Sequence, residues 1–136
     1  MILGTADPNT AMPWTAPVYY IFRAGKCYFF SNQMSRHIRH LELGADAAAS
    51  IFKDSPSIDG LAGVQMQGRC TVCSPGREAV TAAAAYALKY GIFIKGDHPV
   101  DYFARVFKAA LYAFVPESVY FMDNSTGFGH RTLVIL

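Results

Sequence analysis

Short stretches of β-forming residues, separated by residues that favour turns, run through most of the chain and constrain its fold more than any other feature. They lie at residues 2–5, 14–22, 27–30, 47–52, 61–73, 111–115, 118–122 and 132–136. The tetrapeptide Arg23-Ala24-Gly25-Lys26 has the composition of a hairpin turn. Pro17, inside the second stretch, predicts an edge strand, a bulge or a segment whose backbone faces a ligand.

Two places in this pattern predict helices. Ser35 is placed to cap a short helix, and Gly44 follows where that helix ends. The Ala-rich residues 78–90 predict a second helix, and Pro99 begins a third over residues 99–108. Short strands joined mostly by hairpins, with helices inserted at two places, predict a mainly β, α+β fold, built as a small antiparallel barrel.

The composition fits one domain that spans residues 1–136. The chain is 52% hydrophobic, which is enough for a core at this length. Charged residues make up only 16% and aromatic residues 14%, so part of the apolar surface is expected to be covered by a partner or a flat ligand. A second copy of the chain is the commonest such partner, and we expect a homodimer.

Charge and hydropathy exclude several kinds of partner. The net charge is +2, and the twelve Lys and Arg residues are scattered, so no basic stripe suited to nucleic acid is present. No apolar run approaches the roughly 20 residues of a membrane span, and the N-terminus lacks the pattern of a secretory signal. We therefore expect a cytoplasmic protein that binds neither nucleic acid nor membrane.

No metal site is predicted. Cys70 and Cys73 lie in an expected strand, where positions three apart face opposite sides, and no second CxxC completes a zinc site. His37 and His40 share a helix face, but no further ligand lies at a suitable spacing. The common hydrolase, triphosphate and dinucleotide motifs are also absent from the sequence.

Five segments resemble the FMN-binding split-barrel superfamily that includes pyridoxamine 5'-phosphate oxidase. They read APVYY at residues 16–20, YFFSNQMSRHIRHLE at 28–42, AAASIF at 47–52, GVQMQGRC at 63–70 and VYFMDNSTGFGHR at 119–131. The last segment is similar to the end of a small uncharacterised bacterial branch of that superfamily. The resemblance implies an antiparallel split barrel that forms a homodimer and binds FMN at the dimer interface.

Carried onto this chain, the resemblance implies that Ser31, Ser35, Arg36 and His37 hold the FMN phosphate. Their chemistry agrees, because a phosphate dianion favours a guanidinium fork and hydroxyl donors. The alternative for this segment is a plain helix cap beside a solvated arginine. The resemblance places the other flavin contacts on Pro17, Val18, Tyr19, Tyr20, Phe30, Gln65 and Gln67.

Several positions depart from the oxidase pattern. Arg36-His37 replaces Arg-Lys, so the second positive charge depends on pH. Thr15, Tyr20 and Gly63 stand where the oxidase has an arginine, a lysine and a glutamine. These departures argue against pyridoxamine phosphate oxidation and leave flavin binding in place. Gln65 and Gln67 share a strand face, where they meet the flavin or simply face solvent.

Two functions follow from these observations. The first is a small FMN-dependent oxidoreductase that exchanges electrons with a small-molecule donor or acceptor, with the redox chemistry supplied by the flavin. The second is a non-catalytic dimeric module, a sensor or carrier, that binds flavin, haem or another flat ligand. The sequence names neither the substrate nor a catalytic acid–base pair.

Overall fold

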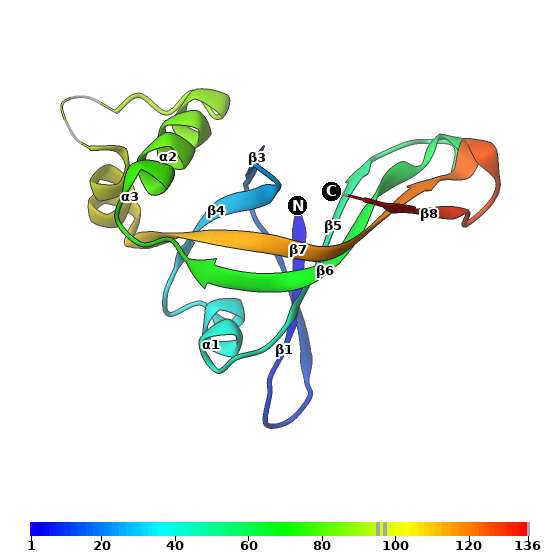
Figure 1. The fold of residues 1–136 in the computed structure, drawn as a ribbon, viewed down its shortest axis with the longest axis horizontal. Helices are drawn as coiled ribbons and strands as arrows, with labels where there is room; N and C mark the ends of the chain where they lie inside the picture. The colour runs from blue at the N-terminus through cyan, green and yellow to red at the C-terminus, as the bar shows by residue number, and fades with distance from the viewer. Residues whose placement is uncertain (95, 97, 136) are drawn as a thin grey trace.

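The computed structural model describes residues 1–94, 96 and 98–135, which form one antiparallel sheet with three α-helices (Figure 1). The eight strands of these residues run in the order β2-β1-β5-β6-β7-β4-β3, and β8 pairs with β7. The α+β antiparallel fold predicted from the sequence is confirmed. The elements are β1 (Ile2–Ala6), β2 (Pro13–Pro17), β3 (Ile21–Arg23), β4 (Lys26–Asn32), α1 (Arg36–Glu42), β5 (Ala47–Lys53), η1 (Ile58–Gly60), β6 (Ala62–Val72), α2 (Arg77–Lys89), α3 (Pro99–Phe107), β7 (Ala109–Asp123), η2 (Asn124–Thr126) and β8 (Arg131–Val134).

Strand β7 is one long strand, whereas the sequence predicted two strands at residues 111–115 and 118–122. Pro116 lies inside it, opposite Gly68 of β6, at a shift in register between Gln67 and Gly68. The extra residue of this bulge accommodates a proline, which cannot donate to the ladder. A Cβ at position 68 would collide with the Val115 carbonyl, so the close approach requires glycine.

The predicted strand over residues 14–22 is interrupted. It ends at Pro17 as the edge strand β2 and resumes at Ile21 as β3, so residues 18–20 belong to no strand. Of the three alternatives for Pro17, an edge strand is the one observed, since among the described strands β2 pairs only with β1. The backbone of Tyr20 is bonded instead by side chains from the end of α2, and this replacement explains why the strand breaks here.

The predicted turn and helix boundaries are confirmed at two positions with positive φ. The β3–β4 hairpin turns on Ala24 and Gly25, whose φ angles of 48° and 75° suit a two-residue turn. Gly44, with φ of 88°, follows the end of α1. Ser35 occupies the N-cap position, but its side chain does not cap the helix and donates instead to the Asn32 carbonyl.

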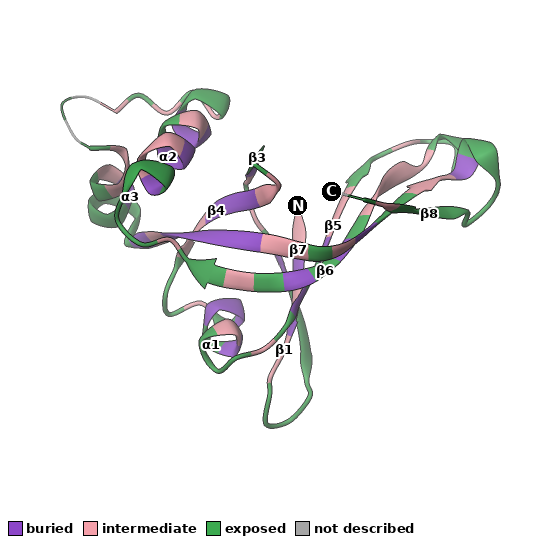
Figure 2. Ribbon diagram, viewed as in Figure 1, coloured by how far each residue is buried: buried purple, intermediate pink, exposed green. Residues whose placement is uncertain are grey.

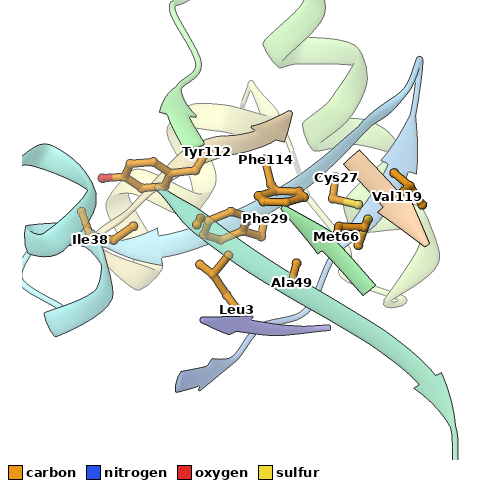
Figure 3. Close-up of a cluster of buried hydrophobic side chains, with 10 residues drawn as sticks. Leu3, Cys27, Phe29, Ile38, Ala49, Met66, Tyr112, Phe114 and Val119 are labelled. Atoms are coloured by element: carbon orange, nitrogen blue, oxygen red, sulfur yellow. The ribbon is translucent and has the colours of Figure 1, made fainter. Parts of the chain in front are cut away.

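Five strands and α1 contribute the main core (Figure 3). Leu3, Phe29 and Phe114 are fully buried, and the Phe29 ring stacks on Tyr112 with centroids 5.7 Å apart. Full burial of each large apolar side chain contributes about 1.5–3 kcal/mol. Ile38 joins this core from α1, so packing fixes the helix that follows β4.

A second core cluster attaches α2 and α3 to the other face of β4 and β7. Alanines on α2, among them Ala79 and Ala82, are buried against the sheet, and their small size permits close approach (Figure 2). Glu78 accepts hydrogen bonds from the Tyr28 hydroxyl at 2.6 Å and from Lys26 Nζ at 2.8 Å. Because β4 and β7 bury both faces, their sequences are almost continuously apolar.

None of the helices in the described residues has both the length and the apolar composition that crossing a bilayer requires.

Candidate functional site

A cavity of about 520 Å³ opens between the β2–β3 connection, the end of β4, and the helices α2 and α3. Its size lies within the range of small-molecule sites. Strand β4 enters it with Phe30 and Ser31, and α1 places His37 beside them. The lining residues are Pro17, Val18, Tyr19, Phe30, Ser31, Asn32, His37, Tyr86, Tyr90, Ile92, Phe103, Phe107 and Ala109.

Two hydroxyls and an imidazole converge at one end of this cavity, which we call the polar end. Ser31 Oγ lies 2.8 Å from His37 Nε2 and 3.2 Å from Ser35 Oγ. Ser35 Oγ lies 3.3 Å from the same His37 nitrogen. Among the described residues that line the cavity, none is Asp or Glu. The polar end therefore offers hydrogen-bond donors to an anion without carboxylate repulsion.

The polar end is held by local structure on both sides of the β4–α1 turn. The Ser35 N–H and hydroxyl both donate to the Asn32 carbonyl, at 3.0 and 2.7 Å. On α1, the buried His40 makes a 3.1 Å hydrogen bond through Nδ1 to the buried Thr5 hydroxyl of β1. These bonds fix the helix face that presents His37.

The surroundings of His37 favour its neutral form in the free protein. Burial lowers the pKa of His37 below its ordinary value, and nearby His40 lowers this pKa further. A neutral ring can donate or accept at Nε2 according to its tautomer, so it adapts to either serine. A dianion bound here would favour the protonated ring, which adds a positive charge only when the ligand is present.

The structure places seven of the predicted flavin contacts at this cavity. Six line it directly, and Ser35 is hydrogen-bonded to two of these. The six are Pro17, Val18, Tyr19, Phe30, Ser31 and His37.

The other predicted contacts lie elsewhere. Arg36 is exposed, with its guanidinium carbon 4.7 Å from the centre of the Trp14 ring. Tyr20 lines a separate apolar hollow, and Gln65 and Gln67 are exposed on β6. The structure thus does not bring these four residues to the cavity within one chain.

The β2–β3 connection, which forms one wall of the cavity, is held by α2. The Tyr90 hydroxyl accepts from the Tyr20 N–H at 2.9 Å and donates to the Tyr20 carbonyl at 2.7 Å. Lys89 Nζ donates to the same carbonyl at 2.7 Å. These side-chain hydrogen bonds replace those of a strand partner. The β2–β3 connection therefore keeps its shape although residues 18–20 are not in the sheet.

The aromatic part of the cavity was not predicted from the sequence. Six rings from four segments line it, and we call them the aromatic wall: Tyr19, Phe30, Tyr86, Tyr90, Phe103 and Phe107. Tyr86 and Tyr90 are four residues apart, as are Phe103 and Phe107. That spacing places each pair on one helix face and was the available signal. It does not reveal that the two faces meet over β4.

Comparisons with known proteins point to the same fold. No protein-family model matches the chain. UPF0306 protein YhbP of Escherichia coli O157:H7 is 24% identical over 122 residues, which cover 88% of this chain and 75% of that protein.

Two solved structures illustrate the range of similar proteins. A haem-binding protein from Mycobacterium smegmatis has a TM-score of 0.72 at 20% identity, covering 98% of this chain and 51% of that one. A protein of the pyridoxinephosphate oxidase family from Clostridium acetobutylicum has a TM-score of 0.60 at 12% identity, covering 99% and 85%. This chain therefore has the antiparallel split-barrel fold, which it shares with pyridoxamine 5'-phosphate oxidase-like proteins and with haem-binding proteins.

Proposed function

We propose that this chain is an FMN-binding flavoprotein that acts as a small flavin-dependent oxidoreductase. The observation that carries the proposal is the polar end, where Ser31, Ser35 and His37 converge within 3.3 Å beside an aromatic cavity. Such a site suits a planar ligand with one anionic arm. FMN, when bound, supplies the redox chemistry, and the protein supplies binding, orientation and electrostatics.

Different residues of the cavity would bind the phosphate and the ring of FMN. The Ser31 hydroxyl would donate to a phosphate oxygen, and the Ser35 hydroxyl would do so after it rotates away from the Asn32 carbonyl. His37 would gain a proton and add a charge-assisted donor. The backbone and side chains of residues 17–19 and the ring of Phe30 provide the surface for the flavin ring. The two hydrogen bonds between the Tyr90 hydroxyl and the Tyr20 backbone hold that surface in place. No side chain of the protein has to act as an acid or a base in this function.

A second candidate is haem binding, which the structural similarity to the haem-binding protein of M. smegmatis favours. Among the described residues that line the cavity, His37 is the one imidazole that could ligate iron. Its Nε2 is already within 2.8 Å of Ser31 and 3.3 Å of Ser35. Ligation through this nitrogen would break both contacts, and for this reason we place FMN first.

Absorption spectroscopy tests the two candidates directly. Protein mixed with excess FMN and then desalted should keep a yellow flavin band at one FMN per chain. Bleaching of this band by NADH or NADPH without oxygen would support an oxidoreductase, and an unreactive bound flavin would support a carrier or sensor. Loss of all flavin on desalting, together with a shifted Soret band after hemin addition, would contradict the proposal.

A further inference from the structure

We propose that the α2 and α3 side of the aromatic wall, formed by Tyr86, Tyr90, Phe103 and Phe107, binds a second ligand beside the flavin, and that this ligand is an uncharged planar ring bearing an oxygen. The inference rests on the proposed function, because it assigns the polar end to the FMN phosphate. It concerns the opposite part of the cavity, which α2 and α3 build.

Charge argues for a neutral ligand. Among the described residues lining the cavity, none carries a fixed positive or negative charge, and the anion-binding groups all lie at the polar end. Lys89 contacts the wall, but its Nζ donates to the Tyr20 carbonyl and lies 4.3 Å from the centre of the Tyr20 ring. A second phosphate-bearing ligand would therefore lack a partner for its charge, and its desolvation would oppose binding.

The shape of the wall argues for a planar ligand. Phe30 and Phe103 stack with centroids 3.9 Å apart, and Phe103 stacks on Phe107 at 5.7 Å, so these rings support one another. Phe107, on the α3 side, is 52% exposed although it lines the cavity. A bound ring would cover this open face by an offset or edge contact.

Tyr86 supplies the hydrogen bond that selects an oxygen-bearing ring. Its hydroxyl makes no hydrogen bond to the described residues, whereas the Tyr90 hydroxyl is used by the Tyr20 backbone. No side-chain polar atom in the described part of the chain is both fully buried and unpaired, so the Tyr86 hydroxyl keeps access to solvent. Burial and the neighbouring tyrosines raise the pKa of Tyr86 to about 12, which keeps it a donor at neutral pH.

Calorimetric titration with two probes tests the inference. Menadione is an uncharged naphthoquinone with two carbonyl oxygens, and pyridoxine 5'-phosphate is a single pyridine ring with a charged arm. Menadione should bind the FMN-saturated protein and the FMN-free protein alike, and pyridoxine 5'-phosphate should not bind the FMN-saturated protein. Equal binding of both probes to the FMN-saturated protein would overturn the inference.

Two variants locate the binding. Phe107→Arg adds a cation and removes a ring face, so it should weaken menadione about tenfold and allow pyridoxine 5'-phosphate to bind. Tyr86→Phe should weaken menadione about 2- to 10-fold, the value of one neutral hydrogen bond. The matched control is Phe93→Arg, because Phe93 is 87% exposed and does not line the cavity.

The outcomes separate this inference from the proposed function. Failure of FMN to bind would contradict the proposed function. Menadione binding to the FMN-free protein would still be about tenfold weaker in Phe107→Arg if the aromatic wall is its site. Unchanged menadione binding in both Phe107→Arg and Tyr86→Phe would overturn the inference even in a protein that binds FMN.

Discussion

Arg36 is the residue whose expected role and observed position differ most. It follows Ser35 directly, yet its guanidinium stacks on Trp14 and does not line the cavity. Stacking on a ring is worth about 0.5–1 kcal/mol at an exposed site, less than a charge-assisted bond to phosphate at about 1.5–3 kcal/mol. We therefore expect Arg36 to leave Trp14 when FMN binds.

Replacing Arg36 with Ala should weaken FMN binding by about 1.5–3 kcal/mol and leave riboflavin, which lacks the phosphate, almost unchanged. Arg36→Lys should restore only part of the loss, because an ammonium cannot form the bidentate pair. Quenching of flavin fluorescence measures both ligands. Arg39→Ala is the matched control, since Arg39 lies on the same helix and donates to the Met34 carbonyl. Equal weakening of FMN and riboflavin would show that Arg36 does not hold the phosphate.

His37 should make FMN binding depend on pH. Burial lowers the pKa of His37 in the free protein, and a phosphate dianion beside Nε2 raises it in the complex. Binding then takes up a proton, so FMN affinity should fall as the pH rises through the pKa of the complex. Titrations between about pH 6.5 and 8.5, above most of the phosphate's own protonation, measure this slope.

Two controls isolate the histidine. His37→Asn keeps a hydrogen-bonding side chain without a titrating group and should abolish the slope. Riboflavin should show no slope with either protein. A slope that persists in His37→Asn would place the titrating group elsewhere.

At the scale of elements, α2 determines the shape of the cavity wall. Tyr90→Phe removes both of its hydrogen bonds to the Tyr20 backbone and leaves the half-buried Tyr20 N–H unpaired, while Lys89 still donates to the carbonyl. The variant should therefore lower the free energy of unfolding by about 1–3 kcal/mol. The affinities for FMN and for riboflavin should fall together, because the β2–β3 connection faces the flavin ring and not the phosphate. Urea denaturation and flavin titration measure the two effects.

Tyr102→Phe is the control for the loss of the Tyr90 hydrogen bonds. Tyr102 lies on α3 and its hydroxyl makes no hydrogen bond to the described residues. The stability and flavin affinity of the Tyr102→Phe protein should match those of the wild type. If Tyr90→Phe behaves like this control, the β2–β3 connection does not depend on α2.

Elements with strong local signals could be predicted from the sequence, and those decided by distant partners could not. The β3–β4 turn and the end of α1 follow from Gly25 and Gly44, whose φ angles are positive. The continuity of β7 through Pro116 depends on the bulge opposite Gly68, which no local rule reveals. The break at residues 18–20 likewise depends on Tyr90, seventy positions away from Tyr20.

At the scale of the molecule, the candidate site also has one part that depends on residues close in sequence and one part that depends on distant segments. The family resemblance named Ser31, Ser35 and His37 together, and because they are close in sequence one turn brings their side chains together. The aromatic wall could not be predicted, since it forms only when α2 and α3 fold back over β4. Alternation along the strand shows that Gln65 and Gln67 share one face of β6, but it does not show whether that face lines the cavity or meets solvent. In the structure both side chains are exposed.

We propose that a second copy of the chain covers an apolar hollow of about 390 Å³ formed mainly by residues of β5, β6, β7 and β8. Phe22, Val64, Phe121 and Val134 line it, and Phe22 and Phe121 are more than two-fifths exposed. Figure 2 shows that the extended ends of β6, β7 and β8 are largely exposed or half-buried. A chain with so few charges should cover this surface.

Light scattering should give twice the 14.9 kDa mass of the chain at micromolar concentration. Phe121→Glu should shift the protein toward the monomer, because it places a charge in the apolar hollow. Leu88→Glu is the control, since Leu88 is 85% exposed on α2, away from this hollow. A wild-type monomer, or a Phe121→Glu dimer as stable as the wild type, would contradict the proposal.

The most direct measurement of the phosphate site is a calorimetric comparison of FMN and riboflavin binding to the wild-type protein. The two ligands share the flavin ring and differ only in the phosphate. If the polar end holds that phosphate with at least two charge-assisted hydrogen bonds, FMN should bind about 100-fold more tightly, at one FMN per chain. Equal affinities for the two ligands, or no binding of FMN, would contradict a phosphate site at Ser31, Ser35 and His37.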